Sequence, residues 1–208
     1  MVRAAVLASG DGVRLQAILD AVYFKEIPNF ELVAVICPQR SCFAMTRAIS
    51  AGVPAYVVDP ELFPNMTTHS MAVANKLKDM DIELVILADY SVPLGVVPYQ
   101  FKNRIIGTYP ALYPAFSEEE GDLMTLTLES GLKVTGATAF FSDGDGHVGA
   151  VISQKALAIA ADETPQSLSE RLLEECEWPL LKEAITLFCA KRLSVRGKQV
   201  EIRPSEDE

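Results

Sequence analysis

The sequence has few of the residues that build metal sites, and it is short of basic charge. It contains four cysteines without any C-x-x-C pair, and only two histidines, His69 and His147. A zinc site is therefore not expected. It has 18 Lys and Arg residues against 28 Asp and Glu residues, which gives a net charge of −10. Because such a chain lacks the cationic surface that neutralises phosphates along a nucleic acid, we expect no nucleic-acid partner.

Long apolar runs are missing as well. No segment approaches the ~18 consecutive apolar residues that a membrane span needs. The opening "MVRAAVLASGDG" has a short apolar run that leads directly into a glycine turn, unlike a signal peptide. We therefore expect a soluble, cytoplasmic protein without a membrane partner. Each cysteine lies in or beside an apolar segment, so reduced thiols used for packing are expected.

The composition provides a large core, since 50% of the 208 residues are hydrophobic. The first 110 residues alternate between short, continuous apolar runs and segments with helical spacing. This alternation predicts an α/β fold with a Rossmann-like, doubly wound, mostly parallel sheet that is covered on both faces. Strands are expected at 3–8, 31–37, 55–58, 83–88 and 104–109, and helices at 13–24, 42–52 and 68–80.

The second half follows a different pattern. Two β-branched, apolar runs (133–142 and 149–159) are expected to pair antiparallel around the turn at 143–148. A long C-terminal helix follows, with Thr164 as its cap, and Pro179 is expected to kink or split it. We expect a closing hairpin, one domain over 1–203 with a phosphate-binding half at 1–110 and a second half at 111–203, and an acidic tail at 204–208.

One loop has the features of a phosphate site. In open α/β sheets, ligands bind outside the carboxyl ends of the strands, where the loops 9–14, 88–95 and 107–114 should converge. The first of these, within "SGDGVRL", has two glycines before a helix N-terminus and a cation, Arg14. Free N–H groups, the helix dipole and that charge would suit a phosphate. The same residues would also fit an ordinary tight turn between a strand and a helix that binds no ligand.

A second loop, "DGDGHVG" (143–149), is rich in aspartate and glycine. Such a composition suits either calcium or a simple turn, and the spacing of an EF-hand is absent. We therefore assign no metal site. His147 is a candidate acid–base group in this loop, although a lone loop histidine is more often solvated.

Several segments in order resemble the folate-dependent glycinamide ribonucleotide formyltransferases. They are "VLASGDGVRLQAILDA", "ELVILADY", "NRIIGTYPALYP" and "GLKVTGATAFFSDGDGHVGAVISQKAL", and the resemblance continues to about residue 202. It implies the formyltransferase fold, with residues 111–203 on the folate side. That family transfers a formyl group from 10-formyltetrahydrofolate to the amine of glycinamide ribonucleotide in purine synthesis. No tightly bound cofactor is implied, and 10-formyltetrahydrofolate would be a co-substrate.

The resemblance breaks at the catalytic positions. The reaction needs a donor for the developing oxyanion and a group that exchanges protons near neutral pH, and the family uses an asparagine, a histidine and an aspartate. The asparagine position falls on Gly107 and the histidine position on Tyr109. The aspartate position falls on His147, or on Asp145 if a gap of one residue is allowed.

The binding positions are better preserved. The phosphate loop is implied to comprise Gly10, Asp11, Gly12, Val13 and Arg14, with Arg14 where the family often has asparagine. Glu174 matches a glutamate that contacts the ribose. In the folate loop, Asp89 replaces a usual glycine, and the residues implied to line this loop are Ala88, Asp89, Tyr90, Val92 and Leu94.

Three functional hypotheses follow. The first is a family member without the usual activity, which binds a phosphorylated ribose-like ligand and acts as a regulatory or partner subunit. The second is a retuned enzyme with His147 as proton acceptor and Tyr109 as donor. The third is an ordinary formyltransferase that relies on Asp145 and backbone N–H groups. A small phosphorylated ligand is the expected partner, and a homodimer stays open beside a monomer.

Overall fold

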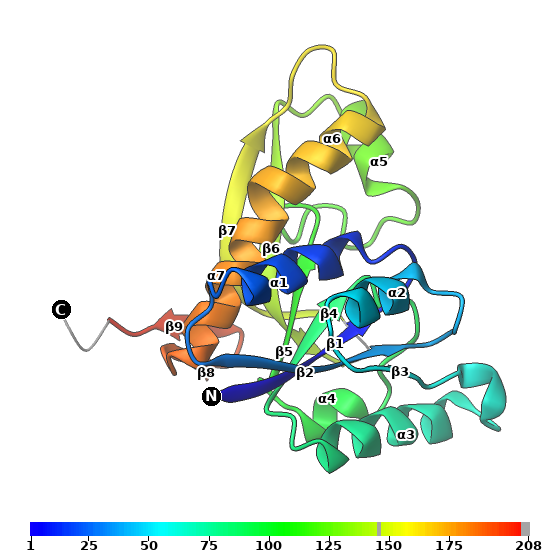
Figure 1. The fold of residues 1–208 in the computed structure, drawn as a ribbon. Coiled ribbons are helices and arrows are strands. Elements are labelled where there is room, and N and C mark those ends of the chain that lie inside the picture. Colours follow the sequence, from blue (N-terminus) through cyan, green and yellow to red (C-terminus); the bar gives the residue numbers. More distant parts are fainter. Residues whose placement is uncertain (145–146, 205–208) are drawn as a thin grey trace.

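The computed structural model describes residues 1–144 and 147–204, which form one nine-stranded sheet with helices on both faces (Figure 1). The strand order is β3-β2-β1-β4-β5-β6-β7-β9-β8. The strands are β1 (Val2–Ala8), β2 (Phe30–Cys37), β3 (Ala55–Val57), β4 (Leu84–Ala88), β5 (Ile105–Tyr109), β6 (Val134–Asp143), β7 (His147–Ala158), β8 (Leu193–Arg196) and β9 (Gln199–Ile202).

The helices divide between the two faces of the sheet. In Figure 1, α1 and α2 lie on one side of the strands, and α3 and α4 lie on the other. The short elements η1 and α4 were not predicted from the sequence. The helical elements are α1 (Val13–Tyr23), α2 (Phe43–Ser50), η1 (Pro60–Leu62), α3 (Met66–Asp79), α4 (Val97–Gln100), α5 (Leu123–Glu129), α6 (Pro165–Leu172), η2 (Leu173–Glu177) and α7 (Trp178–Cys189).

The direction of the strands confirms the predicted fold class. The pairs β1–β2, β1–β4, β2–β3 and β4–β5 are parallel, and β5–β6 and β6–β7 are antiparallel. The sheet is therefore doubly wound in its first half and mostly antiparallel in its second, where β8–β9 is antiparallel and only β7–β9 among the described pairs is parallel. Because β1, β4 and β5 are parallel neighbours, the loops that follow them leave from the same edge of the sheet.

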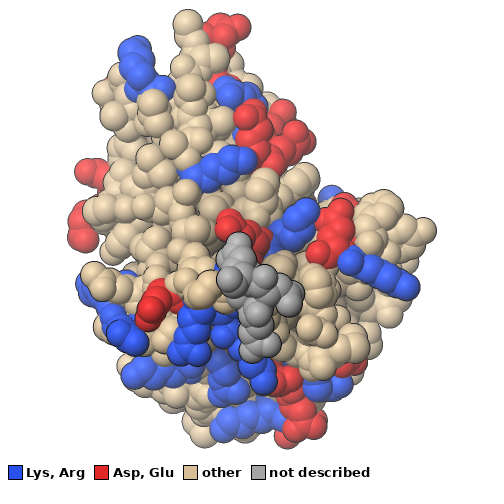
Figure 2. All heavy atoms as spheres, turned by 90° about the vertical axis from the view of Figure 1, so that its left-hand side faces the viewer, with Lys and Arg blue, Asp and Glu red and all other residues tan. Residues whose placement is uncertain are grey.

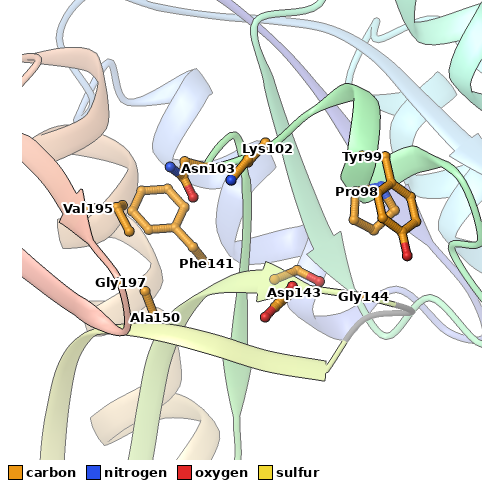
Figure 3. A pocket seen from close by; sticks show the side chains of 11 residues that line it. Pro98, Tyr99, Lys102, Asn103, Phe141, Asp143, Gly144, Ala150, Val195 and Gly197 are labelled. Atoms are coloured by element: carbon orange, nitrogen blue, oxygen red, sulfur yellow. The ribbon is translucent and has the colours of Figure 1, made fainter.

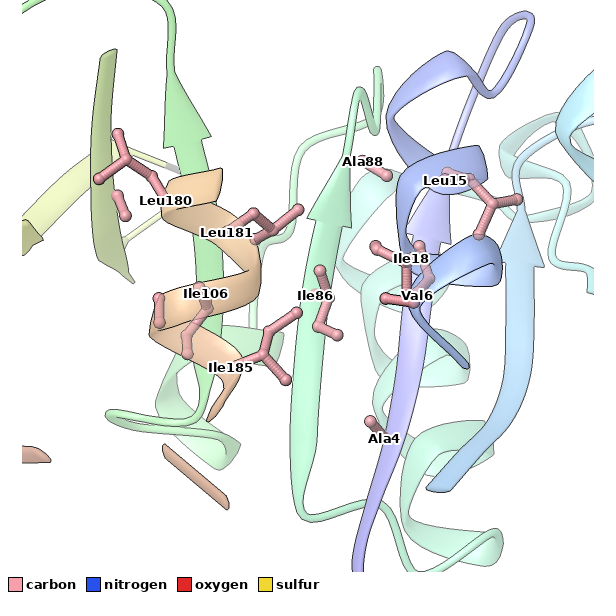
Figure 4. Close-up of a cluster of buried hydrophobic side chains, with 14 of the residues drawn as sticks. Ala4, Val6, Leu15, Ile18, Ile86, Ala88, Ile106, Leu180, Leu181 and Ile185 are labelled. Carbon is pink, nitrogen blue, oxygen red and sulfur yellow. The ribbon is translucent and has the colours of Figure 1, made fainter. Parts of the chain in front are cut away.

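Two apolar layers hold the helices to the sheet. Along β1, Ala4 and Val6 face the layer shared with α1 and α7, whereas Ala5 and Leu7 face the layer shared with α3 and α4. Figure 4 shows the first layer, in which Ile185 of α7 and residues of α1 lie over the strands. Burial on both faces explains why these strands are continuous apolar runs in the sequence.

The C-terminal helix is interrupted directly before Pro179, close to where the sequence predicts a kink or a split. The break is a π-helical turn, η2, and Pro179 lies just after it in the first turn of α7. The chain stays helical through this turn, since Leu173, Glu177 and Trp178 all have right-handed helical φ and ψ. Pro179 lacks the N–H that would bond to residue 175, and its ring crowds the carbonyl of that residue, which lies within the π turn. The π turn adds a residue to the helical repeat and thereby rotates the following face.

The cysteines have the packing role expected for them. Cys37, Cys42, Cys176 and Cys189 are all free and buried. Burial raises the pKa of the Cys37 thiol to about 12, with a further contribution from Cys42. The Cys37 thiol therefore stays protonated at neutral pH. All four buried thiols pack as small apolar groups.

The surface charge is unevenly distributed despite the acidic composition. Figure 2 shows Lys and Arg side chains gathered in the lower half of the face that it presents. Five of the 18 basic residues fall between positions 191 and 203, in and around the β8–β9 hairpin. Among the described helices, none is long and apolar enough to cross a membrane.

Candidate active site

The loop after β1 is held in a tight turn against α2. Gly12 has a φ of 70°, and a Cβ at this position would lie 2.7 Å from the Cα of Ala44. Only glycine fits there, because both the conformation and the space exclude a side chain. The N–H of Ala44 donates to the carbonyl of Gly10 at 3.3 Å, which anchors the loop.

One donor at the start of α1 is already used within this loop. The N–H of Val13 donates to Oδ1 of Asp11 at 3.1 Å. Nε of Arg47 donates to the carbonyl oxygen of Asp11 at 2.7 Å, so the aspartate is fixed at its backbone too. The carboxylate of Asp11 thus occupies part of the place that a ligand anion would take at the helix N-terminus.

Arg14 forms the electrostatic centre of the site. Its Nε and Nη2 donate to the two carboxylate oxygens of Glu177 at 2.9 and 2.7 Å, and its Nη1 donates to Asp89. Burial alone would lower the pKa of Arg14, but the hydrogen bonds and charge of Glu177, together with Asp89, raise it above the ordinary value. The guanidinium is therefore permanently charged and already paired with two carboxylates.

These contacts bring the three loops together at one edge of the sheet. Oγ1 of Thr108, at the end of β5, donates to Oε2 of Glu177 at 2.7 Å. The N–H and Oγ of Ser91, after β4, both donate to Oγ of Ser9 at 3.0 Å. The loops 9–14 and 88–95 and the end of β5 therefore meet around Arg14.

The folate-loop positions divide into core and surface residues. Ala88 and Leu94 are buried, and Val92 and Tyr90 are half-buried. The hydroxyl of Tyr90 is enclosed and has no hydrogen-bond partner within residues 1–144 and 147–204. Asp89 is exposed, with a φ of 58°, a conformation that glycine adopts more easily. Its carboxylate is the part of this loop that reaches Arg14.

Gly107 lies where a neighbouring aromatic ring fills the space. A Cβ built on Gly107 would lie 3.1 Å from Cζ of Phe140 and 3.4 Å from Cβ of Leu87. Phe140 is the cross-strand partner of Gly107 and is buried. The position therefore offers no side-chain donor, and a larger residue would need the phenyl ring to move.

Tyr109 is engaged with its own loop. Its hydroxyl donates to the carbonyl oxygen of Ala115 at 3.1 Å, and its ring packs edge-on against Tyr113 with the centroids 6.1 Å apart. Burial, and secondarily the nearby Tyr113, raise the pKa of Tyr109 above its ordinary value near 10. The phenol thus stays protonated at neutral pH and cannot serve as a proton acceptor.

Replacing Tyr109 with phenylalanine is expected to lower the free energy of unfolding by about 1 kcal/mol, since one net hydrogen bond is lost. The expected effect on any residual formyl transfer is none, because the hydroxyl is turned to Ala115. Urea unfolding and a turnover assay on the same preparation check both statements. A fall in turnover without a change in stability would favour a catalytic hydroxyl instead.

His147 does not lie beside Tyr109. Along β6, Tyr109 pairs with Thr138, whereas His147 pairs with Asp143, five residues further on. At about 3.3 Å per residue, this separates the two positions by roughly 17 Å along the strand. The proposed proton-transfer pair is therefore not assembled, and Asp145 lies outside the described residues.

Asp143 and Gly144, at the end of β6, border a different cavity. This cavity, of about 360 Å³, lies between the segment after α4, the β6–β7 hairpin and the β8–β9 hairpin (Figure 3). Asp143 and Phe141 line it, together with Lys102 and Asn103, which precede β5. It therefore lies toward the amino end of β5, away from the loops around Arg14. Within residues 1–144 and 147–204, no cluster of His, Cys, Asp and Glu is suited to a metal ion.

Glu177, the glutamate that binds Arg14, was not predicted as a site residue from the sequence. Glu174, the expected ribose contact, is exposed, whereas Glu177 is only 2% exposed and holds Arg14. A signal for Glu177 was present, since it precedes apolar residues at i+3, i+4, i+7 and i+8. It therefore lies on the buried stripe of α7, where an unpaired carboxylate would be costly. The apolar residues of that stripe are Leu180, Leu181, Ala184 and Ile185.

Residues 2–185 match the protein family described as "Formyl transferase". The chain belongs to this family. The match covers the sheet from β1 to β7 and most of α7, so it includes every contact around Arg14. The sequence resemblance and the observed strand order thus lead to the same family.

Comparison with individual members gives the same result. The chain is 31% identical over 196 residues to the trifunctional purine biosynthetic protein adenosine-3 of Gallus gallus, covering 93% of this chain and 19% of that protein. It thus spans about a fifth of that relative's length. It is 27% identical over 173 residues to phosphoribosylglycinamide formyltransferase of Bacillus subtilis, covering 83% and 87% of the two chains.

Solved structures of the family superpose closely. Glycinamide ribonucleotide transformylase 1 of Symbiobacterium toebii matches with a TM-score of 0.90 and 36% identity, covering 98% of this chain and 95% of that chain. Phosphoribosylglycinamide formyltransferase of Coxiella burnetii matches with a TM-score of 0.88 and 28% identity, covering 98% and 94%. The scaffold of the family is therefore retained.

Proposed function

We propose that this chain is a phosphoribosylglycinamide formyltransferase-like protein of folate-dependent one-carbon and purine metabolism that has little or no normal formyl transfer. It binds a small phosphorylated, ribose-like ligand at the loop of Gly10 to Arg14. The relative named as a purine biosynthetic protein supports the pathway, and the relatives named for glycinamide ribonucleotide or phosphoribosylglycinamide support the class of ligand.

The observation that carries the loss of transfer is the state of the two positions at the end of β5. Gly107 offers no side-chain donor and is packed against Phe140, and the hydroxyl of Tyr109 donates to Ala115. Formyl transfer needs a donor at the oxyanion and a group that exchanges protons near neutral pH. Neither position supplies such a group.

The retuned enzyme has less support. It requires Tyr109 and His147 at one reaction centre, and the strand register keeps them at different points along β6. The ordinary formyltransferase would depend on Asp145 and on backbone donors. The same assay separates all of these alternatives.

The deciding experiment is formyl transfer from 10-formyltetrahydrofolate to glycinamide ribonucleotide, with the Bacillus subtilis enzyme as the positive control. We expect kcat/KM at least about a thousandfold below the control, since an oxyanion donor and an acid–base group each contribute about a hundredfold or more. Calorimetric titration with glycinamide ribonucleotide is expected to detect binding. Turnover within tenfold of the control would contradict the proposed loss of activity.

A further inference from the structure

Two donors of the phosphate loop, the N–H of Val13 and the guanidinium of Arg14, are already bound to carboxylates of the protein itself. Arg14 is paired with Glu177 and Asp89, and the N–H of Val13 is paired with Asp11. One guanidinium and its two partner carboxylates carry a net charge of −1. The loop is therefore not an open cationic site, and an incoming anion meets negative charge.

The two carboxylates on Arg14 differ in how firmly they are held. The side chain of Glu177 is 2% exposed, binds the guanidinium through both oxygens and also accepts from Thr108. The side chain of Asp89 is 43% exposed and binds through one oxygen. Water can solvate Asp89 when it leaves Arg14, whereas Glu177 has no such alternative. Asp89 is thus the exchangeable partner.

The backbone at Asp89 favours the same exchange. Its φ of 58° lies in the left-handed region, which is unfavourable for residues other than glycine. Leaving this conformation therefore lowers the free energy of the backbone at Asp89. Asp89 follows β4 directly, at the start of the loop that Ser91 ties to Ser9. The ion pair with Arg14 therefore helps to hold this loop in its present shape.

We propose that Asp89 determines which anions the phosphate loop accepts. Its carboxylate pairs with Nη1 of Arg14, and a ligand binds by taking the place of this carboxylate. A phosphate monoester with two negative charges competes with a carboxylate, whereas a diester with one charge competes poorly. This inference rests on the proposed phosphorylated ligand and adds the charge that the ligand must carry. Binding also releases Asp89 and so loosens the loop of residues 89–95.

The test compares Asp89→Asn with wild type in titration calorimetry against ribose 5-phosphate, its methyl diester and ribose. Asparagine keeps the shape and tolerates the positive φ, so only the charge is removed. We expect the variant to bind ribose 5-phosphate about tenfold more tightly and to prefer it less over the diester, while ribose is unaffected. Asp81→Asn is the matched control, since Asp81 is an exposed aspartate with a φ of 53° that follows α3.

Hydrogen exchange gives a second readout. In wild type, ribose 5-phosphate should speed amide exchange in residues 89–95, and in Asp89→Asn the exchange should be fast without ligand. Equal affinities of wild type and Asp89→Asn, with binding present, would overturn the role of Asp89 and leave the phosphate site standing. The double variant Arg14→Gln/Glu177→Gln removes the cation together with its buried partner. If it bound ribose 5-phosphate as wild type does, or if no protein bound it, both the role of Asp89 and the phosphate site would be overturned.

Discussion

Arg14→Met is expected to lower the free energy of unfolding by about 3 to 5 kcal/mol, because it leaves a buried carboxylate without its partner. Glu177 is almost fully buried, and after this substitution the hydroxyl of Thr108 is its only remaining side-chain hydrogen-bond partner among the described residues. Glu177→Leu should cost less, since Arg14 is partly exposed and keeps Asp89. The double variant Arg14→Met/Glu177→Leu should recover most of the loss, since apolar pairs replace buried ion pairs well.

Urea unfolding of the four proteins gives the coupling between the two positions as a double-mutant cycle. Lys182→Met is the control, because Lys182 and Glu26 form an ion pair at 2.9 Å in which both side chains are nearly half exposed. Such a surface pair contributes about 0 to 1 kcal/mol. If Arg14→Met cost no more than Lys182→Met, the central role given to the buried pair would be wrong.

Restoring the family's side chains should raise formyl transfer only when the packing is changed as well. Gly107→Asn alone is expected to cost about 1 to 3 kcal/mol and to add no turnover, since its Cβ would crowd the ring of Phe140. With Phe140→Leu and Tyr109→His, the asparagine gains room and a group that titrates near neutral pH appears. This triple variant is expected to exceed wild-type turnover by about a hundredfold or more.

The matched control for that experiment is Gly107→Ala/Phe140→Leu/Tyr109→Phe, which changes the packing without adding a donor or an acid–base group. Turnover is measured with 10-formyltetrahydrofolate and glycinamide ribonucleotide, and folding is checked by circular dichroism. A triple variant no faster than this control would show that the deficit lies elsewhere in the site.

The parallel half of the fold was predictable because its strands are buried on both faces and read as unbroken apolar runs. The antiparallel β6–β7 pair was predictable from its β-branched runs and the turn between them. Short elements such as α4, with four residues, are too brief to show a period. The interruption of the C-terminal helix was predicted at Pro179 and lies directly before it, but its form, a π turn over Leu173–Glu177, was not predicted.

The site was predictable only in its local part. Glycines, a helix start and Arg14 within seven residues indicated an anion loop. The partners of Arg14 lie 75 and 163 residues away in the chain, at Asp89 and Glu177. The sequence therefore predicted an unpaired cation at Arg14, whereas in the fold two carboxylates neutralise its charge. The distance between Tyr109 and His147 also depends on strand register, which local patterns did not give.

The span between Arg14 and Glu177 also has a consequence for how the protein is made. Strands β1 to β5 and their helices can form as the chain emerges, but Arg14 gains its buried partner only after α7 has left the ribosome and docked. During that interval α1 lacks the apolar cover of α7, and the surface shown in Figure 4 is open to other chains. Contacts this distant slow folding. A nascent chain stalled before α7 is thus the form in which this protein most needs a chaperone.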